Sequence, residues 1–284
     1  MEFSHSPESR ELSKERVPIL KGPEPAPRSV IQMRVAVLLK QAPDTTAKIG
    51  VSGSRVDESA ITKWSISPYD EYALESAIAL KESGADELVA ITCGPQRASK
   101  CLTEAAAVGA DRLIHIVTDA DFMDSCTVQS ILSSAIERSE CDIVLCGKQA
   151  ADTNSGSTGP GVASLLGYSC VGSVTEVSMD GGKLSATRLG ATGLERIEVS
   201  GPCLFTFDKG EVELRRPNVR GIMMAKKKPI ESIGIEDLEI EIGSPRASLK
   251  SHSSPPEKPP GQRFEGAGSI EIVVGKLRDE ANVI

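Results

Sequence analysis

The residues from Gly147 to Pro160 read GKQAADTNSGSTGP and follow a short apolar run, CDIVLC. Glycines let backbone amides approach an anion, and the start of the following helix offers unpaired N–H groups and a partial positive charge. The hydroxyls of Ser157 and Thr158 can add donors, and Asp152 can accept a hydrogen bond from a ribose hydroxyl or an adenine amine. This pattern is typical of a loop that holds the phosphate of a nucleotide.

A plain polar loop explains the same residues if Thr158 simply caps the helix before Pro160. The segment matches neither the P-loop nor the GxGxxG pattern, and the chain has no SGGxDS-type pyrophosphate loop. The pattern alone therefore leaves both interpretations open and gives no support to adenylating chemistry.

No other set of side chains is typical of a catalytic or metal centre. The histidines His5, His115 and His252 are dispersed, and the apolar run around His115 predicts a hydrogen-bonded core residue. The carboxylate pairs Asp70–Glu71 and Glu236–Asp237 are typical of solvated faces. The sequence favours a nucleotide-holding or partner-docking protein over a hydrolase, and it predicts no metal.

The composition excludes several classes of protein. Aromatic residues make up only 3% and the formal net charge is −8, which argues against binding nucleic acid. No apolar run approaches the roughly 20 residues that a membrane span needs. The 7 cysteines form no CxxC pair, so we expect reduced thiols in a cytoplasm-like compartment.

Short apolar runs alternate with helical patterns between residues 34 and 167. Ser67, Pro68 and Gly84 suit the N-cap, first position and C-cap of one such helix. The alternation predicts an α/β fold with an open, mostly parallel sheet and helices on both faces. Expected strands are 34–40, 87–94, 112–117 and 141–147, and expected helices are 67–84, 95–111, 127–139 and 159–167.

The pattern changes after residue 170. Segments 172–179, 180–190, 193–201 and 203–210 alternate apolar and polar residues, which predicts an addition of antiparallel hairpins at one edge of the sheet. We expect an α/β domain over residues 33–230 and an extended C-terminal arm over 231–284, with a short helix near its end. Residues 1–32 are rich in Pro, Glu and Ser and predict a disordered extension.

A second segment of interest is PNVRGIMMAKKKPI, residues 217–230. Its apolar residues beside three lysines predict an exposed apolar tip next to a basic patch, suited to a protein partner. A buried Met pair followed by a solvated charge run is the alternative.

Five segments, in this order, resemble the β subunit of electron-transfer flavoprotein. They read VAVLLKQAPD, ISPYDEYALESAIALKE, CGPQRASKCLTEAAAVGADRLIHI, DIVLCGKQAADTNSGSTG and RRPNVRGIMMAKKKPI, and the resemblance extends from Met33 to the C-terminus. It implies an adenine-nucleotide-binding (HUP-like) α/β fold. It also implies a heterodimer whose α subunit makes most contacts to a redox-active FAD.

The resemblance implies an electron carrier rather than a catalyst on its own. It would take electrons from acyl-CoA or related dehydrogenases and pass them to a quinone oxidoreductase, with a structural AMP in this subunit. The C-terminal arm would wrap the α subunit. We expect a prokaryotic cytoplasmic protein rather than one of the mitochondrial matrix.

The resemblance also assigns site residues. Ser157 stands where the family usually has Gln, and Thr158 is typical of the AMP-binding members. The AMP site would be formed by Leu38, Ser67, Pro68, Tyr69, Asp70, Cys93, Gly147, Lys148, Gln149, Ala150, Ala151, Asp152, Thr153, Asn154, Ser155, Gly156, Ser157 and Thr158. The partner-recognition loop would contain Val219 as its anchor, with Ile222, Met223, Met224, Lys226, Lys227 and Lys228.

Two alternatives remain. In electron-bifurcating relatives a second FAD replaces the AMP and accepts the hydride of NADH. The second alternative is a stand-alone adenine-nucleotide sensor of similar topology. Such a sensor needs neither the hairpins nor the recognition loop nor the arm, so these features argue against it.

Overall fold

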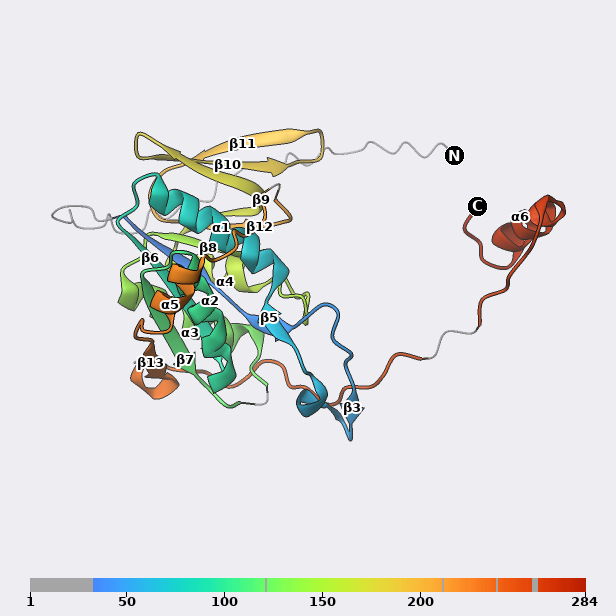
Figure 1. Cartoon of the computed structure of the whole chain (residues 1–284), viewed down its shortest axis with the longest axis horizontal. Coiled ribbons are helices and arrows are strands. Elements are labelled where there is room, and N and C mark those ends of the chain that lie inside the picture. The colour runs from blue at the N-terminus through green and yellow to red at the C-terminus, as the bar shows by residue number, and fades with distance from the viewer. Residues whose placement is uncertain (1–32, 121, 211, 239, 257–259) are drawn as a thin grey trace, which may run out of the picture. The chain divides into compact units, whose positions relative to one another are not determined.

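The computed structural model describes residues 33–284 except residues 121, 211, 239 and 257–259. The disordered extension expected at residues 1–32 lies outside the described residues. The strands of the main sheet are β1 (Arg34–Leu38), β6 (Glu87–Gly94), β7 (Arg112–Val117), β8 (Ile143–Gly147), β9 (Ser169–Asp180), β10 (Lys183–Leu189), β11 (Leu194–Val199), β12 (Cys203–Phe207) and β13 (Glu231–Gly234). They form a nine-stranded sheet in the order β11-β10-β9-β12-β8-β1-β6-β7-β13 (Figure 1).

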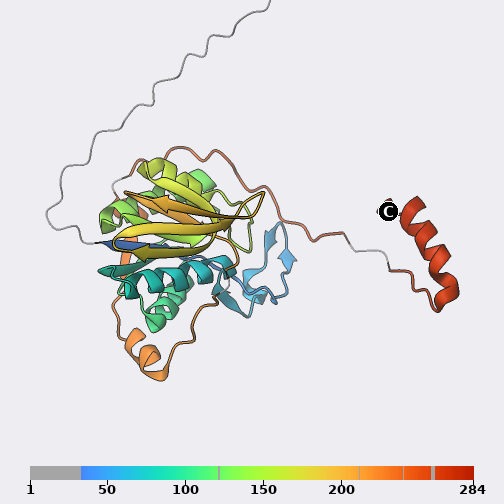
Figure 2. The same ribbon diagram turned by 90° about the horizontal axis from the view of Figure 1, so that it is seen from above.

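Helices cover both faces of the parallel strands, as the sequence predicts. The helices α1 (Pro68–Glu82) and α2 (Ser99–Val108) bury Leu74 and Leu102 in the core on one face. The helices α3 (Ser125–Ser139) and α4 (Thr158–Leu166) bury Ile131 and Val162 on the other. Figure 2 shows the sheet between the two pairs. Strands enclosed in this way read as continuous apolar runs rather than alternating ones.

The hairpin addition is confirmed for β9, β10 and β11, which pair antiparallel. The prediction is wrong for residues 203–210. Strand β12 instead lies parallel between β8 and β9, with Cys203 opposite Ile143. All five of its residues are buried, which the parallel interior of a sheet requires.

The far edge of the sheet is formed by β13, which pairs parallel with β7. This strand belongs to the sheet although it lies beyond the boundary that we predict at residue 230. The short helix α5 (Val219–Ala225) precedes it. Two small sheets, which we did not predict, join β2 (Gln41–Pro43) to β5 (Trp64–Ile66) and β3 (Val51–Ser52) to β4 (Arg55–Val56). Short 3-10 turns occur at Glu58–Ala60, Gln96–Ala98, Ile235–Leu238 and Ala267–Ser269.

The C-terminal arm is extended and ends in the helix α6 (Ile270–Asp279). Hydrogen bonds to the body hold its first part, and two of them involve Asp124 and Ser54. The backbone amide of Arg246 donates to Asp124 Oδ2 over 2.5 Å, and the amide of His252 donates to Ser54 O over 3.0 Å. Asp124 also caps α3, since its Oδ1 accepts from the Thr127 amide over 2.8 Å.

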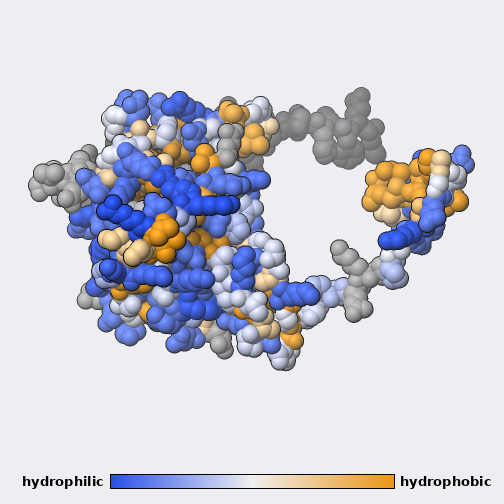
Figure 3. Space-filling model, viewed as in Figure 1, coloured by the Kyte–Doolittle hydropathy of each residue, from blue (hydrophilic) through white to orange (hydrophobic). Residues whose placement is uncertain are grey.

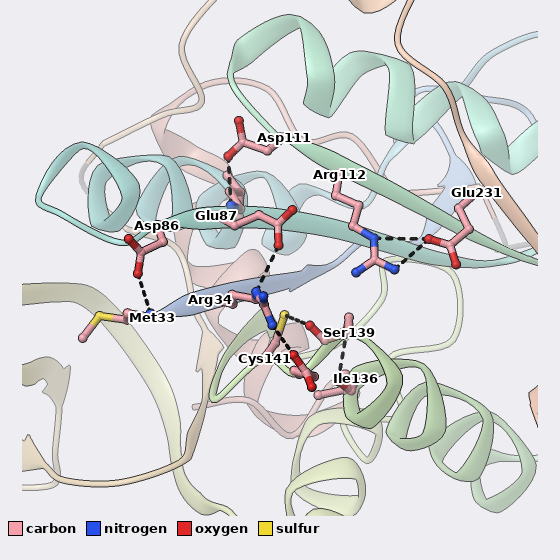
Figure 4. Close-up of polar contacts among 12 residues, drawn as sticks. Met33, Arg34, Asp86, Glu87, Asp111, Arg112, Ile136, Ser139, Cys141 and Glu231 are labelled. Carbon is pink, nitrogen blue, oxygen red and sulfur yellow. Dashed lines mark hydrogen bonds and ion pairs between the residues drawn. The ribbon is translucent and has the colours of Figure 1, made fainter. Parts of the chain in front are cut away.

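Charged residues close the amino end of the parallel strands (Figure 4). Arg34 on β1 contacts Glu87 on β6, with 3.4 Å between Nε and Oε2, and also Glu140 after α3. On the neighbouring strands, Arg112 Nη2 lies 2.8 Å from Glu231 Oε2. These pairs lie at the amino ends of the strands, whereas the candidate site lies at the opposite, carboxyl edge of the sheet.

Candidate functional site

Two neighbouring strands send the chain to opposite faces of the sheet. Strands β8 and β1 pair side by side. The chain leaves β1 through the small β2–β5 sheet to α1 on one face, and leaves β8 through residues 148–157 to α4 on the other. Ligands of open α/β sheets bind at such a switch point, outside the carboxyl ends of the strands.

Asp70, in the first turn of α1, ties these two strand ends together. Its Oδ2 accepts from the Lys40 amide and its Oδ1 from the Gly147 amide, each over 2.8 Å. The carboxyl group is buried, and this burial raises the pKa of Asp70 to about 7. Our interpretation of Asp70 as part of a solvated face is therefore wrong, because its oxygens satisfy backbone donors that a side chain must pair.

The start of α1 also contacts the long loop directly. Ser67 Oγ accepts from the Ala151 amide over 3.3 Å. Gly147 leaves no room for a side chain, because a Cβ there would lie 2.5 Å from Asp70 Oδ1 and 2.7 Å from Tyr69 Cβ. The structure thus brings together Ser67, Tyr69, Asp70 and the 147–158 loop, which the resemblance places in one site.

Ion pairs hold the loop at its first residue and near its middle. Lys40 Nζ lies 2.8 Å from Asp152, and Lys148 Nζ lies 2.7 Å from Asp208 Oδ2. The Lys148 ammonium group also lies over the ring of Tyr69, 4.9 Å from its centroid. Asp152 therefore shares its carboxylate with a lysine at the end of β1.

The start of α4 has polar groups without hydrogen-bond partners among the described residues. Ser157 is the N-cap residue, but among the described residues no side chain caps the helix, and the Ser157 hydroxyl is buried without a hydrogen-bond partner. Thr158 is the first helical residue rather than its cap. Gly159 has no space for a Cβ, which would lie 2.5 Å from Thr206 Cγ2. The unpartnered Ser157 hydroxyl lies beside the N–H groups of the first turn of α4. Donors in this arrangement are suited to a phosphate oxygen.

The other residues that the resemblance assigns to the site have varied surroundings. Leu38 is a core residue, and Cys93 is half-buried at the end of β6, where burial raises the pKa of its thiol to about 12. Gln149 Nε2 donates to Asn154 Oδ1 over 2.9 Å inside the loop. The exposed loop residues are Asp152, Thr153, Asn154 and Ser155, and those of intermediate exposure include Pro68, Lys148, Ala150, Ala151 and Gly156.

A second candidate surface lies on α5. Val219, Met223 and Met224 are 75%, 60% and 59% exposed, and Ile222 is also exposed. Lys226 and Lys227 follow on the surface. In Figure 3 the position of α5 coincides with an apolar patch amid hydrophilic surface. Of our two interpretations, the structure shows the exposed apolar tip and not the buried Met pair.

Contacts of three residues in and around α5 hold it in place. Arg215, before the helix, bonds two carboxylates of α1: its Nη2 lies 2.8 Å from Glu75 Oε1 and its Nη1 2.5 Å from Glu82 Oε1. Gly221 lies against α2, since a Cβ there would lie 2.4 Å from the Ala107 carbonyl oxygen. After the helix, Lys228 Nζ donates to the Ala110 carbonyl oxygen over 2.5 Å.

Comparison with known proteins identifies the family. Residues 58–238 match the family model described as "Electron transfer flavoprotein domain". The electron transfer flavoprotein subunit beta of Bacillus subtilis is 35% identical over 258 residues, which cover 89% of this chain and 100% of that protein. The subunits of Syntrophomonas wolfei and Homo sapiens are 35% and 33% identical and cover 88% and 87% of this chain, and 96% and 98% of their own. The chain belongs to the electron-transfer flavoprotein β-subunit family.

Among the described residues no group of His, Cys, Asp and Glu could hold a metal ion. His115 is a buried core residue, as predicted, but only its Nε2 has a partner, at 3.0 Å from the Gly94 carbonyl oxygen. Burial lowers the pKa of this imidazole. Within the described part of the chain, no helix is long and apolar enough to span a bilayer.

Several residues that hold the site and α5 of this electron-transfer flavoprotein subunit are absent from the sequence-based predictions. Lys40 directly follows a predicted strand at the carboxyl edge, and that position is a signal that could have found it. Asp208, Arg215 and Glu75 bond partners at least 60 residues away in the sequence. No local pattern reports such pairs.

Proposed function

We propose that this β subunit works in a heterodimer with an α subunit, in the prokaryotic cytoplasm. The heterodimer carries electrons from acyl-CoA or related dehydrogenases to a quinone oxidoreductase. We propose further that AMP is bound in the β subunit as a structural element. The observation that carries the AMP proposal is the buried, unpartnered Ser157 hydroxyl beside the uncapped first turn of α4.

The residues at the carboxyl edge have separate roles in this proposal. Ser157, Thr158 and the first N–H groups of α4 would hold the phosphate. The backbone of the loop, braced by Ser67 and Asp70, would enclose the rest of the nucleotide. The redox chemistry belongs to the FAD, which accepts and passes on electrons when bound and which we assign mainly to the α subunit.

The exposed face of α5 supports the docking of a redox partner. Flexible Met side chains adapt to more than one apolar surface, and neighbouring lysines attract an acidic one. Val219, the most exposed of the apolar residues of α5, is the proposed anchor. The α6 helix and the extended arm before it support an interface with the α subunit.

Identification of the bound nucleotides tests this proposal. The αβ complex is purified, denatured and its released nucleotides are separated and quantified. We expect one FAD and one AMP per heterodimer, and reduction of the FAD by an acyl-CoA dehydrogenase with its substrate. Two FAD per heterodimer would instead indicate the bifurcating type. A β chain that is stable and nucleotide-loaded without an α subunit would contradict the heterodimer.

A further inference from the structure

Gln129, on α3, lies across the start of α4. A Cβ on Gly161 would lie 2.1 Å from Gln129 Cδ and 2.4 Å from its Nε2 and Oε1. The carboxamide therefore occupies the space that a side chain at residue 161 would fill. Gln129 Nε2 also donates to the Ser157 carbonyl oxygen over 2.9 Å.

The Ser157 carbonyl thereby receives two donors. The second is the Gly161 amide, at 3.0 Å, which forms the first hydrogen bond of the α4 ladder. Because a peptide group is planar and trans, its N–H points opposite to its C=O. Fixing the Ser157 carbonyl toward α3 and α4 therefore fixes the Thr158 N–H away from the helix body, on the side of the carboxyl edge.

Nothing in the sequence of the 147–158 loop assigns a role to Gln129, which lies 28 residues before Ser157. Ser157 itself makes no side-chain cap, and its hydroxyl stays unpartnered and buried among the described residues. The Gln129 carboxamide is thus a side-chain donor that holds this peptide from outside the loop.

We propose that Gln129 is a positioning residue for the phosphate end of the bound nucleotide. It holds the Ser157–Thr158 peptide so that the Thr158 N–H and the Ser157 hydroxyl are available to an anionic oxygen. This inference rests on the proposed AMP site and deepens it. It predicts an effect on the recognition of phosphate but not of the nucleoside.

Competition experiments on the purified αβ complex test the inference. Labelled AMP is exchanged into the complex and displaced with unlabelled AMP or adenosine, and the ratio of the two displacing concentrations measures the preference for phosphate. Gln129→Met keeps the length and the packing against Gly161 but removes the donor. We expect this variant to lower the preference for AMP over adenosine about fivefold, as the loss of one hydrogen bond does. Its FAD content should stay unchanged.

Two further variants sharpen the test. Gly161→Ala should displace the carboxamide from the other side and lower the preference in the same direction. Ser130→Ala is the matched control, because within the described part of the chain this neighbouring hydroxyl donates to the Cys126 carbonyl oxygen of its own helix, at 3.1 Å. This variant should leave the preference unchanged.

Three results would overturn the inference in distinguishable ways. An unchanged preference in both Gln129→Met and Gly161→Ala shows that the carboxamide does not position the site. Equal weakening of AMP and adenosine shows a general structural effect. A wild-type complex that binds no AMP removes the proposed function itself, and the inference with it.

Discussion

At the residue scale, the candidate site depends on polar side chains that complete the backbone hydrogen bonding of strand ends. Asp70 pairs the amides of Lys40 and Gly147, and Ser67 pairs that of Ala151. A buried amide without a partner is costly, so these side chains set the conformation of the loops. The Ser157 hydroxyl is the exception, and its missing partner is the reason to expect a ligand.

The burial of Asp70 predicts that the free energy of unfolding depends on pH. Its pKa is raised to about 7, above the usual value of 3.8, because the carboxyl group is buried. A group that binds its proton more tightly when folded stabilises the fold fully below pH ~4, and this contribution is lost as the pH rises to about 7. We expect the free energy of unfolding of the wild type, relative to Asp70→Asn, to fall by about 2 to 4 kcal/mol over that window.

Urea denaturation at stepwise pH, with the αβ complex, measures this difference. The exposed Asp180 provides the control, since Asp180→Asn should leave the pH dependence as it is. A difference between wild type and Asp70→Asn that stays constant from pH 4 to 7 would contradict the role of Asp70.

At the element scale, α5 combines an exposed apolar face with a rigid base. Its seven residues are too few for a stable isolated helix. Arg215 contacts α1, Gly221 contacts α2, and Lys228 bonds Ala110 just after α2; these contacts supply the stability that the helix lacks. The exposed face of α5 and the contacts that hold the helix can therefore be tested separately.

Replacing Met223 and Met224 by Ser tests the exposed face. The double variant removes apolar contact area from a docking surface without opening a cavity, so we expect the KM for the dehydrogenase to rise about tenfold or more while the unfolding temperature stays within a degree or two. Steady-state assays with an acyl-CoA dehydrogenase measure the KM, and thermal denaturation measures the unfolding temperature. Ile49→Ser, at another exposed apolar residue, is the control. An unchanged KM would place the partner elsewhere.

Arg215→Met tests the contacts that hold α5 on α1. Glu75 is largely buried and loses its partner, so we expect the unfolding free energy to fall by about 1 to 2 kcal/mol. Because α5 is then held less firmly, the KM for the dehydrogenase should rise while kcat changes little. Arg216→Met removes the exposed neighbouring guanidinium and should change neither quantity. A loss of stability with an unchanged KM would show that the contacts of Arg215 do not contribute to partner docking.

The elements that the sequence predicts best are those with a strong local pattern. The βα alternation from residue 34 to 167 predicts the strands, the helices and the layers, because apolar runs and caps are local signals. The alternating pattern after residue 170 predicts the wrong direction for strand β12. Its apolar run CLFTF is itself typical of a buried parallel strand. The small β2–β5 sheet rests on only three residue pairs, too few to give a pattern.

The candidate site is predictable only in part. The loop and Ser67 lie at the carboxyl edge that the strand order predicts. The burial of Asp70 and the contact of Gln129 with Gly161 arise from tertiary packing between residues 30 or more positions apart. Such contacts follow from the packing of helices and leave no periodicity in the sequence.

At the scale of the whole molecule, the described chain joins an α/β body to an arm with an apolar end. Ile270 and Ile272 of α6 are 61% and 56% exposed, and Figure 3 shows apolar surface on this helix. Apolar area of this kind is typical of a surface that a partner covers. The Asp124 and Ser54 contacts fix the first part of the arm.

Removing residues 264–284 tests the role of this end. We expect the truncated chain to fold, because its sheet and both helical layers remain, but to lose the α subunit at micromolar concentration. Co-purification and gel filtration measure the association. Replacing Ile270 and Ile272 by Ser in the full-length chain should weaken association in the same direction. A heterodimer of unchanged affinity in both variants would exclude α6 from the interface.

The helix α1 has contacts of two kinds at its two ends. Its first turn carries Asp70, beside the proposed nucleotide, while Glu75 and Glu82 further along hold Arg215. With 15 residues it spans about 22 Å as a stiff rod. A nucleotide bound at the proposed site would therefore stabilise the same helix that holds α5 through Arg215. If the proposed AMP is bound there, a ligand that exchanges no electrons would also affect how rigidly the subunit holds the surface proposed for its redox partner.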